Sequence, residues 1–363
     1  MQHWPNITRY TDVRLAGCTT LRLGGPARVF HEARSAQEVI DAVRGAEAAG
    51  EPVLILGGGS NLVVADEGFP GAVVRVATSG TDIRRDPEDG RAAVLRVAAG
   101  EDWDALVARC VTEGLAGVEC LAGIPGLVGA TPIQNVGAYG QEVAETITSV
   151  RAFDRAAGRL VVLGPAACGF GYRTSMFKRR PGRFVLLEVT FRLYPERLSR
   201  PVGYPELASS LGVTPGQRAP LGEVRDAVLA LRRRKGMVLD PADPDTYSAG
   251  SFFTNPALGP AQLAALENAV RRRMGEGVKF PRFPAPDGQV KVPAAWLIEQ
   301  AGFGKGYAAF GARISAKHTL ALTNPGGATT AGLVALAREI REAVREVFGV
   351  VLVNEPVLVG VKL

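Results

Sequence analysis

The sequence is poor in the residues that build metal centres and disulfide frameworks. It has four cysteines and three histidines in 363 residues, with no CxxC spacing and no two histidines close together. This pattern argues against a zinc site and favours thiols that stay reduced in the cytoplasm. We therefore expect a cytoplasmic protein with no metal. The residues concerned are Cys18, Cys110, Cys120, Cys168, His3, His31 and His318.

Long apolar runs are also lacking. No stretch approaches the ~20 apolar residues of a membrane-spanning helix, and the N-terminus has no basic region followed by an apolar core. We expect neither membrane insertion nor a signal peptide. An apolar content of 47% and a charged content of 21% are ordinary for a soluble globular enzyme. The length suggests about two or three domains.

Basic residues are in excess but are not concentrated on one segment. The formal net charge is +6, and the densest cluster is Arg232–Lys235. A nucleic-acid-binding module more typically shows a basic face with interleaved aromatic residues. Two explanations stay open, a polyanionic partner and a bound anionic nucleotide, and we favour the nucleotide.

Two glycine-rich loops are the most informative feature that is present. Residues 123–140 read GIPGLVGATPIQNVGAYG, and residues 54–64 read LILGGGSNLVV. So many glycines and prolines exclude a regular helix or strand. The N–H groups of such backbone, lacking ladder partners, would be free to bind an anion. Each loop alone is best explained as a tight connection, but together they predict a phosphate or dinucleotide site.

Strand and helix patterns alternate through the rest of the chain. Ser35 followed by Glu38 predicts a capping box at the start of a helix. Runs rich in Val, Leu, Phe and Thr predict strands. We expect helices over 36–49, 103–113, 221–234, 260–274, 294–301 and 329–348, strands over 27–33, 53–56, 62–65, 72–76, 93–98, 146–154, 159–163, 184–194 and 350–353, a hairpin or loop over 84–91, and a loop over 200–211 that carries Tyr204.

Three further motifs complete the set. They are YRTSMFK at 172–178, GSFFTNP at 250–256, and Asn354-Glu355 near the end of the chain. With the two glycine loops, they make the chain closely resemble the UDP-N-acetylenolpyruvoylglucosamine reductase family, in the subclass with a substrate-closing tyrosine loop. The resemblance covers essentially the whole chain, and its motifs are far more specific than a lone GxGxxG.

The resemblance implies an α+β fold of the vanillyl-alcohol-oxidase/PCMH type. Two α/β subdomains would bind FAD, and a C-terminal α+β domain would bind substrate. FAD-binding subdomain 1 is expected at 1–78. Subdomain 2 is expected at 79–220, with the C-terminal strand 350–363 returning to it, and the substrate domain at 221–349.

The same resemblance implies the activity. NADPH would reduce the enolpyruvyl group of UDP-N-acetylenolpyruvoylglucosamine to give UDP-N-acetylmuramate through non-covalent FAD, in peptidoglycan precursor synthesis. The implied setting is cell wall biogenesis, with cell shape, cell division and the cell cycle depending on it. The implied partners are small molecules, the UDP-sugar nucleotide and NADPH, with no nucleic acid and a monomeric chain.

Residue roles follow from the resemblance, although each residue alone has an ordinary structural explanation. Arg173 and Glu355 would stabilise an enol or enolate, and Ser251 would deliver a proton. Lys235 would meet the diphosphate of the sugar nucleotide, although the loop that follows it is two residues longer than usual in the family. Tyr139 would gate the pocket, Tyr204 would close over substrate, and Asn255 and Gln300 would line the site. The implied FAD-binding residues are Gly57, Gly58, Gly59, Ser60, Asn61, Leu62, Gly123, Ile124, Pro125, Gly126, Gly129, Ala130, Gln134, Asn135 and Gly137.

The main alternative is an FAD oxidase or dehydrogenase of the same superfamily, acting on a sugar or alcohol. Many such enzymes tether flavin through His or Cys, whereas no histidine here falls in a glycine loop. That favours non-covalent flavin. A second alternative, a nucleic-acid-binding protein, predicts no flavin and steeply salt-dependent binding.

Overall fold

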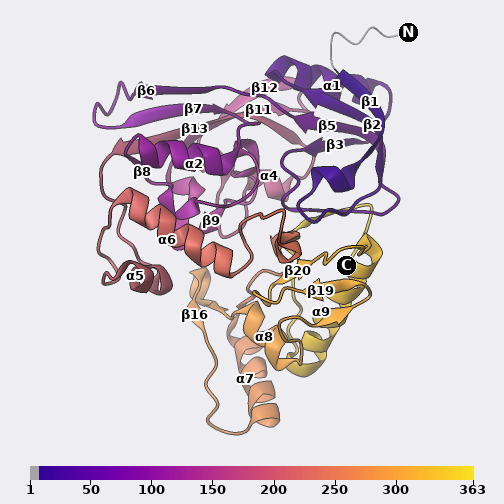
Figure 1. Cartoon of the computed structure of the whole chain (residues 1–363), viewed down its shortest axis with the longest axis vertical. Helices are drawn as coiled ribbons and strands as arrows, with labels where there is room; N and C mark the ends of the chain where they lie inside the picture. Colours follow the sequence, from indigo (N-terminus) through magenta and orange to yellow (C-terminus); the bar gives the residue numbers. More distant parts are fainter. Residues whose placement is uncertain (1–7) are drawn as a thin grey trace. The chain divides into compact units, whose positions relative to one another are not determined.

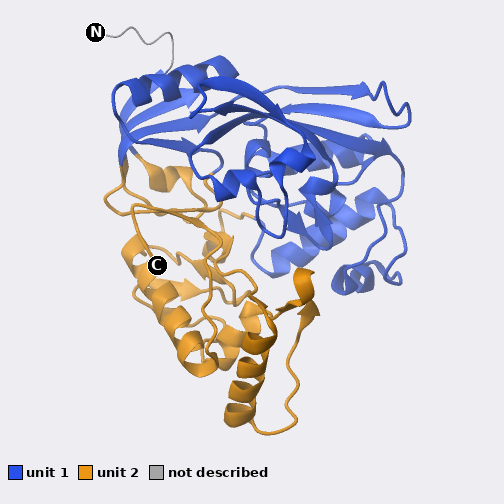
Figure 2. Cartoon of the chain, turned by 180° about the vertical axis from the view of Figure 1, so that it is seen from behind, with its two compact units in different colours: residues 1–13, 27–58, 70–238 blue, residues 14–26, 59–69, 239–363 orange. Residues whose placement is uncertain are grey.

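A computed structural model describes residues 8–363 of the chain. His3, the rest of the N-terminal arm and the start of the predicted first subdomain lie outside the described residues. The chain separates into two compact units, each assembled from segments distant in sequence (Figure 2). Unit 1 comprises the described chain up to Val13, Ala27–Gly58 and Pro70–Val238; unit 2 comprises Arg14–Pro26, Gly59–Phe69 and Leu239–Leu363.

The first sheet of unit 1 has four strands in the order β1-β2-β5-β3. They are β1 (Thr8–Arg14), β2 (Pro26–Ala33), β5 (Phe69–Val76) and β3 (Val53–Leu56), and β3 runs parallel to β5. Helix α1 (Ala36–Ala48) shares a core with this sheet. Its Ser35 hydroxyl accepts the Glu38 N–H at 3.2 Å, and the Glu38 carboxylate accepts the Arg34 N–H at 2.8 Å. The serine half of the predicted capping box is thus confirmed. The glutamate accepts the N–H of Arg34 instead of the N–H of Ser35.

The second sheet of unit 1 is antiparallel between all neighbours along the order β12-β11-β13-β7-β6. Its central strand β13 buries alternate residues such as Val189, Phe191 and Leu193, as a sheet with one face on the core requires. The strands are β6 (Thr81–Arg85), β7 (Ala93–Ala98), β11 (Ile147–Asp154), β12 (Arg159–Leu163) and β13 (Phe184–Pro195), with β8 (Leu115–Ala116) beside the end of β13.

Helices of unit 1 cover this second sheet. Helix α2 (Trp103–Thr112) buries Trp103 fully, and the indole N–H donates to the Leu121 carbonyl at 3.0 Å. Helix α6 (Leu221–Arg234) contacts α2, and α5 (Pro205–Leu211) contacts α6 (Figure 1). All three share one apolar core with the sheet. Shorter elements are β9 (Gly137–Ala138), β10 (Gln141–Glu142), α3 (Pro165–Cys168) and α4 (Met176–Arg179).

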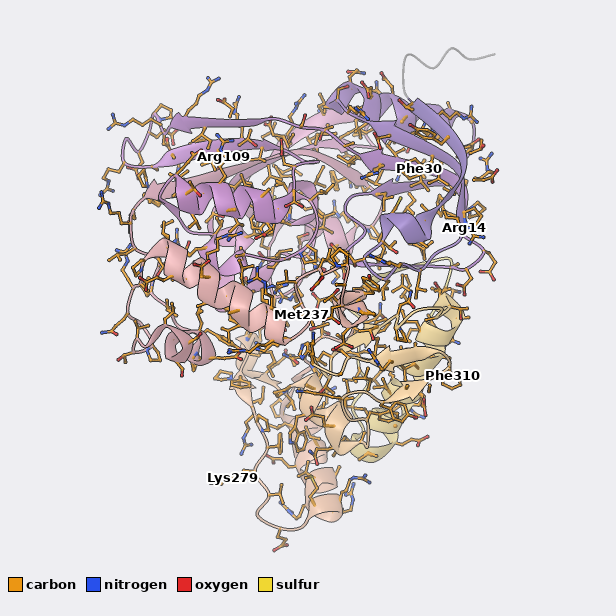
Figure 3. All side chains as sticks on the ribbon, viewed as in Figure 1. Arg14, Phe30, Arg109, Met237, Lys279 and Phe310 are labelled. Carbon is orange, nitrogen blue, oxygen red and sulfur yellow. The ribbon has the colours of Figure 1, made fainter. Side chains whose placement is uncertain are left out.

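Unit 2 is built around the long amphipathic helix α9 (Thr330–Phe348). The Asp66 carboxylate accepts the Thr330 and Ala331 N–H groups at 2.8 and 2.9 Å, so a segment from early in the chain caps this helix. Phe310, labelled in Figure 3, lies in the turn between β18 and β19. The remaining elements are β4 (Leu62–Val64), β14 (Ser248–Ser251), β15 (Ala257–Leu258), α7 (Pro260–Met274), β16 (Phe283–Pro284), β17 (Val290–Lys291), α8 (Ala294–Gln300), β18 (Ala308–Ala309), β19 (Ala312–Ile314), β20 (Ala321–Thr323) and β21 (Val357–Val359).

Most predicted elements are confirmed, and two are wrong. The six predicted helices form with ends that differ by at most one residue. Residues 350–353 form no strand, because only short pairing is available there: Val353 accepts the Thr254 N–H, and Asn354 bridges Phe253. The predicted loop over 200–211 contains α5, which starts at Pro205, a residue suited to the first helical turn.

The units divide the chain differently from the predicted domains. Helix α6 belongs to unit 1 rather than to the C-terminal part, because Val224, Val228 and Leu231 join the core beneath α2. Strand β21 pairs in parallel with β4, within unit 2, and so does not return to residues 79–220. Among residues 8–363, no helix is both long enough and apolar enough to cross a membrane.

Candidate functional site

The two glycine loops touch within unit 1. A Cβ placed on Gly58 would lie 2.8 Å from the Cα of Gly126, a separation that real side chains do not tolerate. Gly57 has more room, since its nearest neighbour would be the Leu127 side chain at 3.8 Å. The absence of a side chain at Gly58 is therefore what allows the two loops to meet.

The first loop leaves its amides available. Within residues 8–363, the backbone N–H groups of Gly57–Ser60 form no hydrogen bond. Gly59 has a φ of 63°, and any side chain on it would meet the Cys18 carbonyl oxygen. Consecutive unpaired amides with a left-handed residue among them are the pattern of an anion-binding nest. This backbone therefore fits the diphosphate of a dinucleotide cofactor.

The second loop does not leave its amides available to the same extent. Gly123 donates to the Asp104 carboxylate at 2.6 Å, Val128 to the Glu101 carbonyl at 2.9 Å and Gly129 to the Ala99 carbonyl at 2.9 Å. The expectation of free N–H groups is wrong at these positions, because the loop is fastened to residues 99–104. It can form a wall beside the nest but is not a second nest over this stretch.

Three candidate residues of unit 1 lie on left-handed backbone. Asn135, Tyr139 and Arg173 have φ values of 48°, 49° and 51°. Such a conformation is uncommon for a residue other than glycine, and strained backbone concentrates at functional sites. No local pattern in the sequence indicates this strain, since none of the three positions is a glycine.

Asn135 holds the second loop together from inside. Its side-chain N–H groups donate to the Glu142 carboxylate at 2.7 Å and to the Gly171 carbonyl at 3.1 Å. Its side-chain oxygen accepts the Ala144 N–H at 3.1 Å, and the residue is buried. The side chain therefore holds the second loop in shape, and its predicted contact with FAD stays a prediction.

Arg173 is placed by its own motif. It lies in a tight turn closed by a bridge between Gly171 and Thr174, and its guanidinium donates to the Gly137 carbonyl at 2.7 Å. The Ser175 hydroxyl donates to the Ile133 carbonyl at 2.6 Å and caps α4. The YRTSMFK motif thus ties its arginine to the second glycine loop.

A cluster from three segments of unit 1 surrounds Lys235. The Tyr139 and Tyr204 rings meet edge to face, with centroids 5.4 Å apart. The Lys235 Nζ lies 5.8 Å from the centre of the Tyr139 ring and 2.6 Å from a Glu206 carboxylate oxygen. Burial raises the pKa of Tyr139 to about 12, so its hydroxyl stays protonated at neutral pH. The structure brings together the predicted residues Tyr139, Tyr204 and Lys235, and adds Glu206.

Arg232 is a residue whose importance the sequence analysis missed. In the sequence it is only one member of the basic cluster Arg232–Lys235, but burial lowers the pKa of Arg232 to about 10. Its guanidinium donates to the carbonyl of Met237, labelled in Figure 3, at 2.8 Å, while its buried Nε has no hydrogen-bond partner within residues 8–363. Helical spacing could have found it, since Arg232 follows the buried residues Leu221 and Val228 along one face of α6.

In unit 2, main-chain hydrogen bonds bring Ser251 and Glu355 into one neighbourhood. Ser251 ends β14, opposite Ala321. The next residue, Phe252, donates to the Leu320 carbonyl at 2.7 Å and accepts the Glu355 N–H at 2.9 Å. Two candidates that are far apart in the sequence are thus fixed on adjoining backbone.

Asn61 and Asn255 also act within unit 2. The Asn61 side chain donates to the Glu355 carbonyl at 3.4 Å, and its own carbonyl accepts the Val357 N–H at 2.9 Å. The Asn255 side-chain oxygen accepts the Ala294 N–H at 2.9 Å, at the start of the helix that ends at Gln300. Both asparagines therefore position elements that carry other candidates.

The candidates divide between the two units. Unit 1 carries Gly57, Gly58, Gly123, Ile124, Pro125, Gly126, Gly129, Ala130, Gln134, Asn135, Gly137, Tyr139, Arg173, Tyr204 and Lys235. Unit 2 carries Gly59, Ser60, Asn61, Leu62, Ser251, Asn255, Gln300 and Glu355.

Comparison with known proteins points to one family. Residues 27–164 match the FAD binding domain, and residues 241–359 match the C-terminal domain of UDP-N-acetylenolpyruvoylglucosamine reductase. A reductase of that name from Thermobifida fusca is 58% identical over 97% of this chain and 98% of its own length. The one from Streptomyces avermitilis is 56% identical over 99% of this chain and 97% of its own length.

A solved structure agrees with the sequence relatives. The crystal structure of UDP-N-acetylenolpyruvylglucosamine reductase from Thermus caldophilus aligns with a TM-score of 0.64 and 26% identity, covering 98% of this chain and 99% of that one. The predicted α+β class is confirmed, with an FAD binding domain followed by the C-terminal domain of this family.

Proposed function

The chain belongs to the UDP-N-acetylenolpyruvoylglucosamine reductase family, and from this membership we propose how its own residues carry the reaction. It is an FAD-dependent oxidoreductase that reduces the enolpyruvyl group of UDP-N-acetylenolpyruvoylglucosamine to UDP-N-acetylmuramate for peptidoglycan synthesis. When bound, FAD supplies the hydride chemistry between NADPH, the reductant, and the terminal alkene carbon of the enolpyruvyl group.

The four amides of Gly57–Ser60 hold the cofactor diphosphate in this proposal. Their lack of acceptors among residues 8–363 is the observation that supports it most directly. The second loop contributes its wall through Gly123, Ile124, Pro125, Gly126, Gly129, Ala130, Gln134 and Gly137. Leu62 adds to the first loop, while Asn61 and Asn135 keep the two loops in place.

Arg173 and Glu355 act on the negative charge that develops on the substrate. Addition of hydride to the alkene pushes electrons onto the carboxylate side as an enol or enolate, which a guanidinium and an acidic group stabilise. The turn around Arg173 and its bond to the Gly137 carbonyl keep its guanidinium in one orientation. Glu355 is held through its backbone by Phe252 and Asn61.

Ser251 delivers the proton in this proposal. The carbon next to the carboxylate needs a proton once hydride has arrived, and a positioned hydroxyl can supply it as a general acid. Its fixed place at the end of β14 supports this assignment.

The remaining candidates bind the nucleotide. Lys235 meets the diphosphate, Tyr204 closes over the substrate, and Tyr139 gates the pocket. Gln300 lines the site from the end of α8, and Asn255 lines it from the segment between β14 and β15. We also propose that the chain is a cytoplasmic monomer and that its product supports cell shape and cell division through the cell cycle.

A direct test is the state of the flavin in purified protein. We expect FAD at about one per chain, released entirely into the supernatant on acid precipitation, because the proposed nest makes only non-covalent bonds. Colour that stays with the precipitate would indicate the covalent flavin of a sugar or alcohol oxidase. A folded but colourless preparation that cannot take up FAD would refute the nest.

The catalytic assignment is tested in two anaerobic additions. NADPH should bleach the flavin absorbance, and the enolpyruvyl nucleotide should then restore it. Bleaching without restoration by this nucleotide would contradict the proposed substrate while leaving the cofactor in place.

A further inference from the structure

The ion pair between Lys235 and Glu206 connects two helix ends of unit 1. Lys235 caps the C-terminus of α6, and Glu206 lies in the first turn of α5, just after Tyr204. Their side chains meet at 2.6 Å. Glu206 therefore forms an ion pair with the lysine that, in the proposed function, binds the nucleotide diphosphate.

The position of Glu206 is set by the core beneath it. Leu207 and Ala208 are buried against α6, which fixes α5 on its inner face. Tyr204 is 42% exposed and Glu206 has a side chain that is 42% exposed, so both lie on the outer face. The carboxylate of Glu206 also acts electrostatically on Tyr139, whose ring packs against Tyr204. One carboxylate thus pairs with the lysine and acts electrostatically on Tyr139.

This pair is weak enough to be exchanged. The Lys235 side chain is 34% exposed, and an exposed ion pair contributes only about 0–1 kcal/mol. A diphosphate brings more negative charge and more acceptor oxygens than one carboxylate, so it can displace Glu206. Displacement would cost little and would also free the start of α5, where Tyr204 lies.

We propose that Glu206 is a positioning residue that holds Lys235 until the diphosphate of the sugar nucleotide takes its place. The inference rests on the proposed function, because it takes Lys235 as a diphosphate contact. Glu206 keeps the ammonium beside the Tyr139 ring in the ligand-free protein. Diphosphate binding then releases Glu206 and lets Tyr204 move with the start of α5.

The test measures binding of UDP and of the enolpyruvyl nucleotide to the FAD-loaded protein at low salt. Glu206→Gln should tighten both about two- to fivefold, the range that loss of a competing pair of up to ~1 kcal/mol allows. Glu223→Gln is the matched control, since it removes one exposed charge at the opposite end of α6. A double-mutant cycle with Lys235→Met should abolish the effect of Glu206→Gln. FAD content should not change, and the midpoint of thermal unfolding should fall by no more than about 2–4 °C, because only this one pair is lost.

Three outcomes would overturn the inference. Equal tightening in Glu206→Gln and Glu223→Gln would assign the effect to overall charge. Weaker UDP binding in Glu206→Gln, restored by Glu206→Asp, would mean that Glu206 supports Lys235 in the complex instead of competing for it. If Glu206→Gln tightened binding of NADPH but not of UDP or the enolpyruvyl nucleotide, Lys235 would contact the diphosphate of NADPH instead.

The proposed function fails separately. If Lys235→Met leaves binding of UDP and the enolpyruvyl nucleotide unchanged, the diphosphate contact is absent, and the inference falls with it. If Lys235→Met weakens binding but Glu206→Gln does not tighten it, only the inference fails.

Discussion

The two units hold their candidate residues in different ways. In unit 1, Asn135, Tyr139 and Arg173 lie on left-handed backbone, and the glycine loops touch at Gly58. In unit 2, neither Ser251 nor Glu355 has a positive φ, and main-chain hydrogen bonds through Phe252 hold them. These unit 1 residues therefore rely on unusual backbone held in place by its surroundings, whereas Ser251 and Glu355 of unit 2 lie on ordinary backbone that presents their side chains.

This difference indicates how each unit is vulnerable. Strained residues cost about 1–3 kcal/mol each and persist only while neighbouring contacts hold them. Added volume at a glycine contact should therefore damage unit 1 broadly. Removal of one functional group should damage the chemistry of unit 2 and leave its structure alone.

The largest effect is expected from Ser251→Ala in unit 2. Loss of the proton donor should slow reoxidation of the reduced protein by the enolpyruvyl nucleotide by about 10²–10⁴-fold, the contribution typical of general acid catalysis. Reduction by NADPH needs no such proton and should stay nearly unchanged. Single-turnover flavin absorbance measures each half-reaction.

The control for this variant is Ser248→Ala, which removes a hydroxyl from the same strand. It should leave both half-reactions within a few-fold of the original protein. If Ser251→Ala slows both half-reactions to the same extent, Ser251 has a structural role. Unit 2 would then not differ from unit 1 in losing only chemistry when one functional group is removed.

Gly58→Ala should have the next largest effect, through backbone in unit 1. Its Cβ would lie 2.8 Å from Gly126, so the two loops must separate, at a cost of about 1–3 kcal/mol. We expect lower FAD retention after gel filtration and a lower midpoint of thermal unfolding. Gly57→Ala is the matched control, because its Cβ would have 3.8 Å of room beside Leu127. Equal behaviour of the two variants would contradict a contact between the loops.

Alkaline pH should weaken unit 1 through its buried thiols. Burial raises the pKa of Cys110 to about 12 and that of Cys168 to about 11, from 9.0. Because the folded pKa is the higher one, this contribution to stability is complete below pH 9 and is lost as pH rises towards 11–12. At pH 10, each thiol should have lost about 1.4 kcal/mol of stability.

Hydrogen exchange compared at pH 8 and pH 10 can locate this loss after correction for the intrinsic exchange rate. Peptides of unit 1 should lose protection first, and Cys110→Ala should show a smaller fall in unfolding free energy between the two pH values. A larger loss in unit 2, whose cysteine Cys18 is only partly buried, would contradict the assignment.

Tyr204→Phe should have the smallest effect. The ring contact with Tyr139 is kept, so FAD content and stability should not change. Loss of the hydroxyl should weaken binding of the enolpyruvyl nucleotide by about two- to tenfold, the value of one hydrogen bond. Titration of the FAD-loaded protein measures it. Unchanged affinity would make Tyr204 an anchor of α5 rather than a residue that closes over substrate.

Local features of the chain could be predicted because their causes lie within a few residues. Ser35 and the apolar spacing after it indicate α1, and the same kind of pattern indicates α9. The long motifs around the glycine loops, Ser251 and Glu355 indicate the family, and the comparisons confirm it. Fold class, cofactor and reaction were accessible for this reason.

Features that depend on distant partners could not be predicted in the same way. The motif places Asn135 among the predicted FAD-binding residues, but it does not indicate that the side chain forms hydrogen bonds with Glu142, Gly171 and Ala144. Residues 350–353 have the composition of a strand, but the only backbone pairing next to them is a short one with Phe253 and Thr254, among the described residues.

The sequence by itself determined most of the elements, the glycine loops and the family, since these depend on local conformational preference and on strings of residues. Only the tertiary structure decided that α6 belongs with α2, that the Nε of Arg232 is buried, and that Glu206 forms an ion pair with Lys235. The reason is physical: burial, ion pairing and backbone strain are set by groups that the chain brings together from distant positions, and their free energies have no counterpart in any short stretch of sequence.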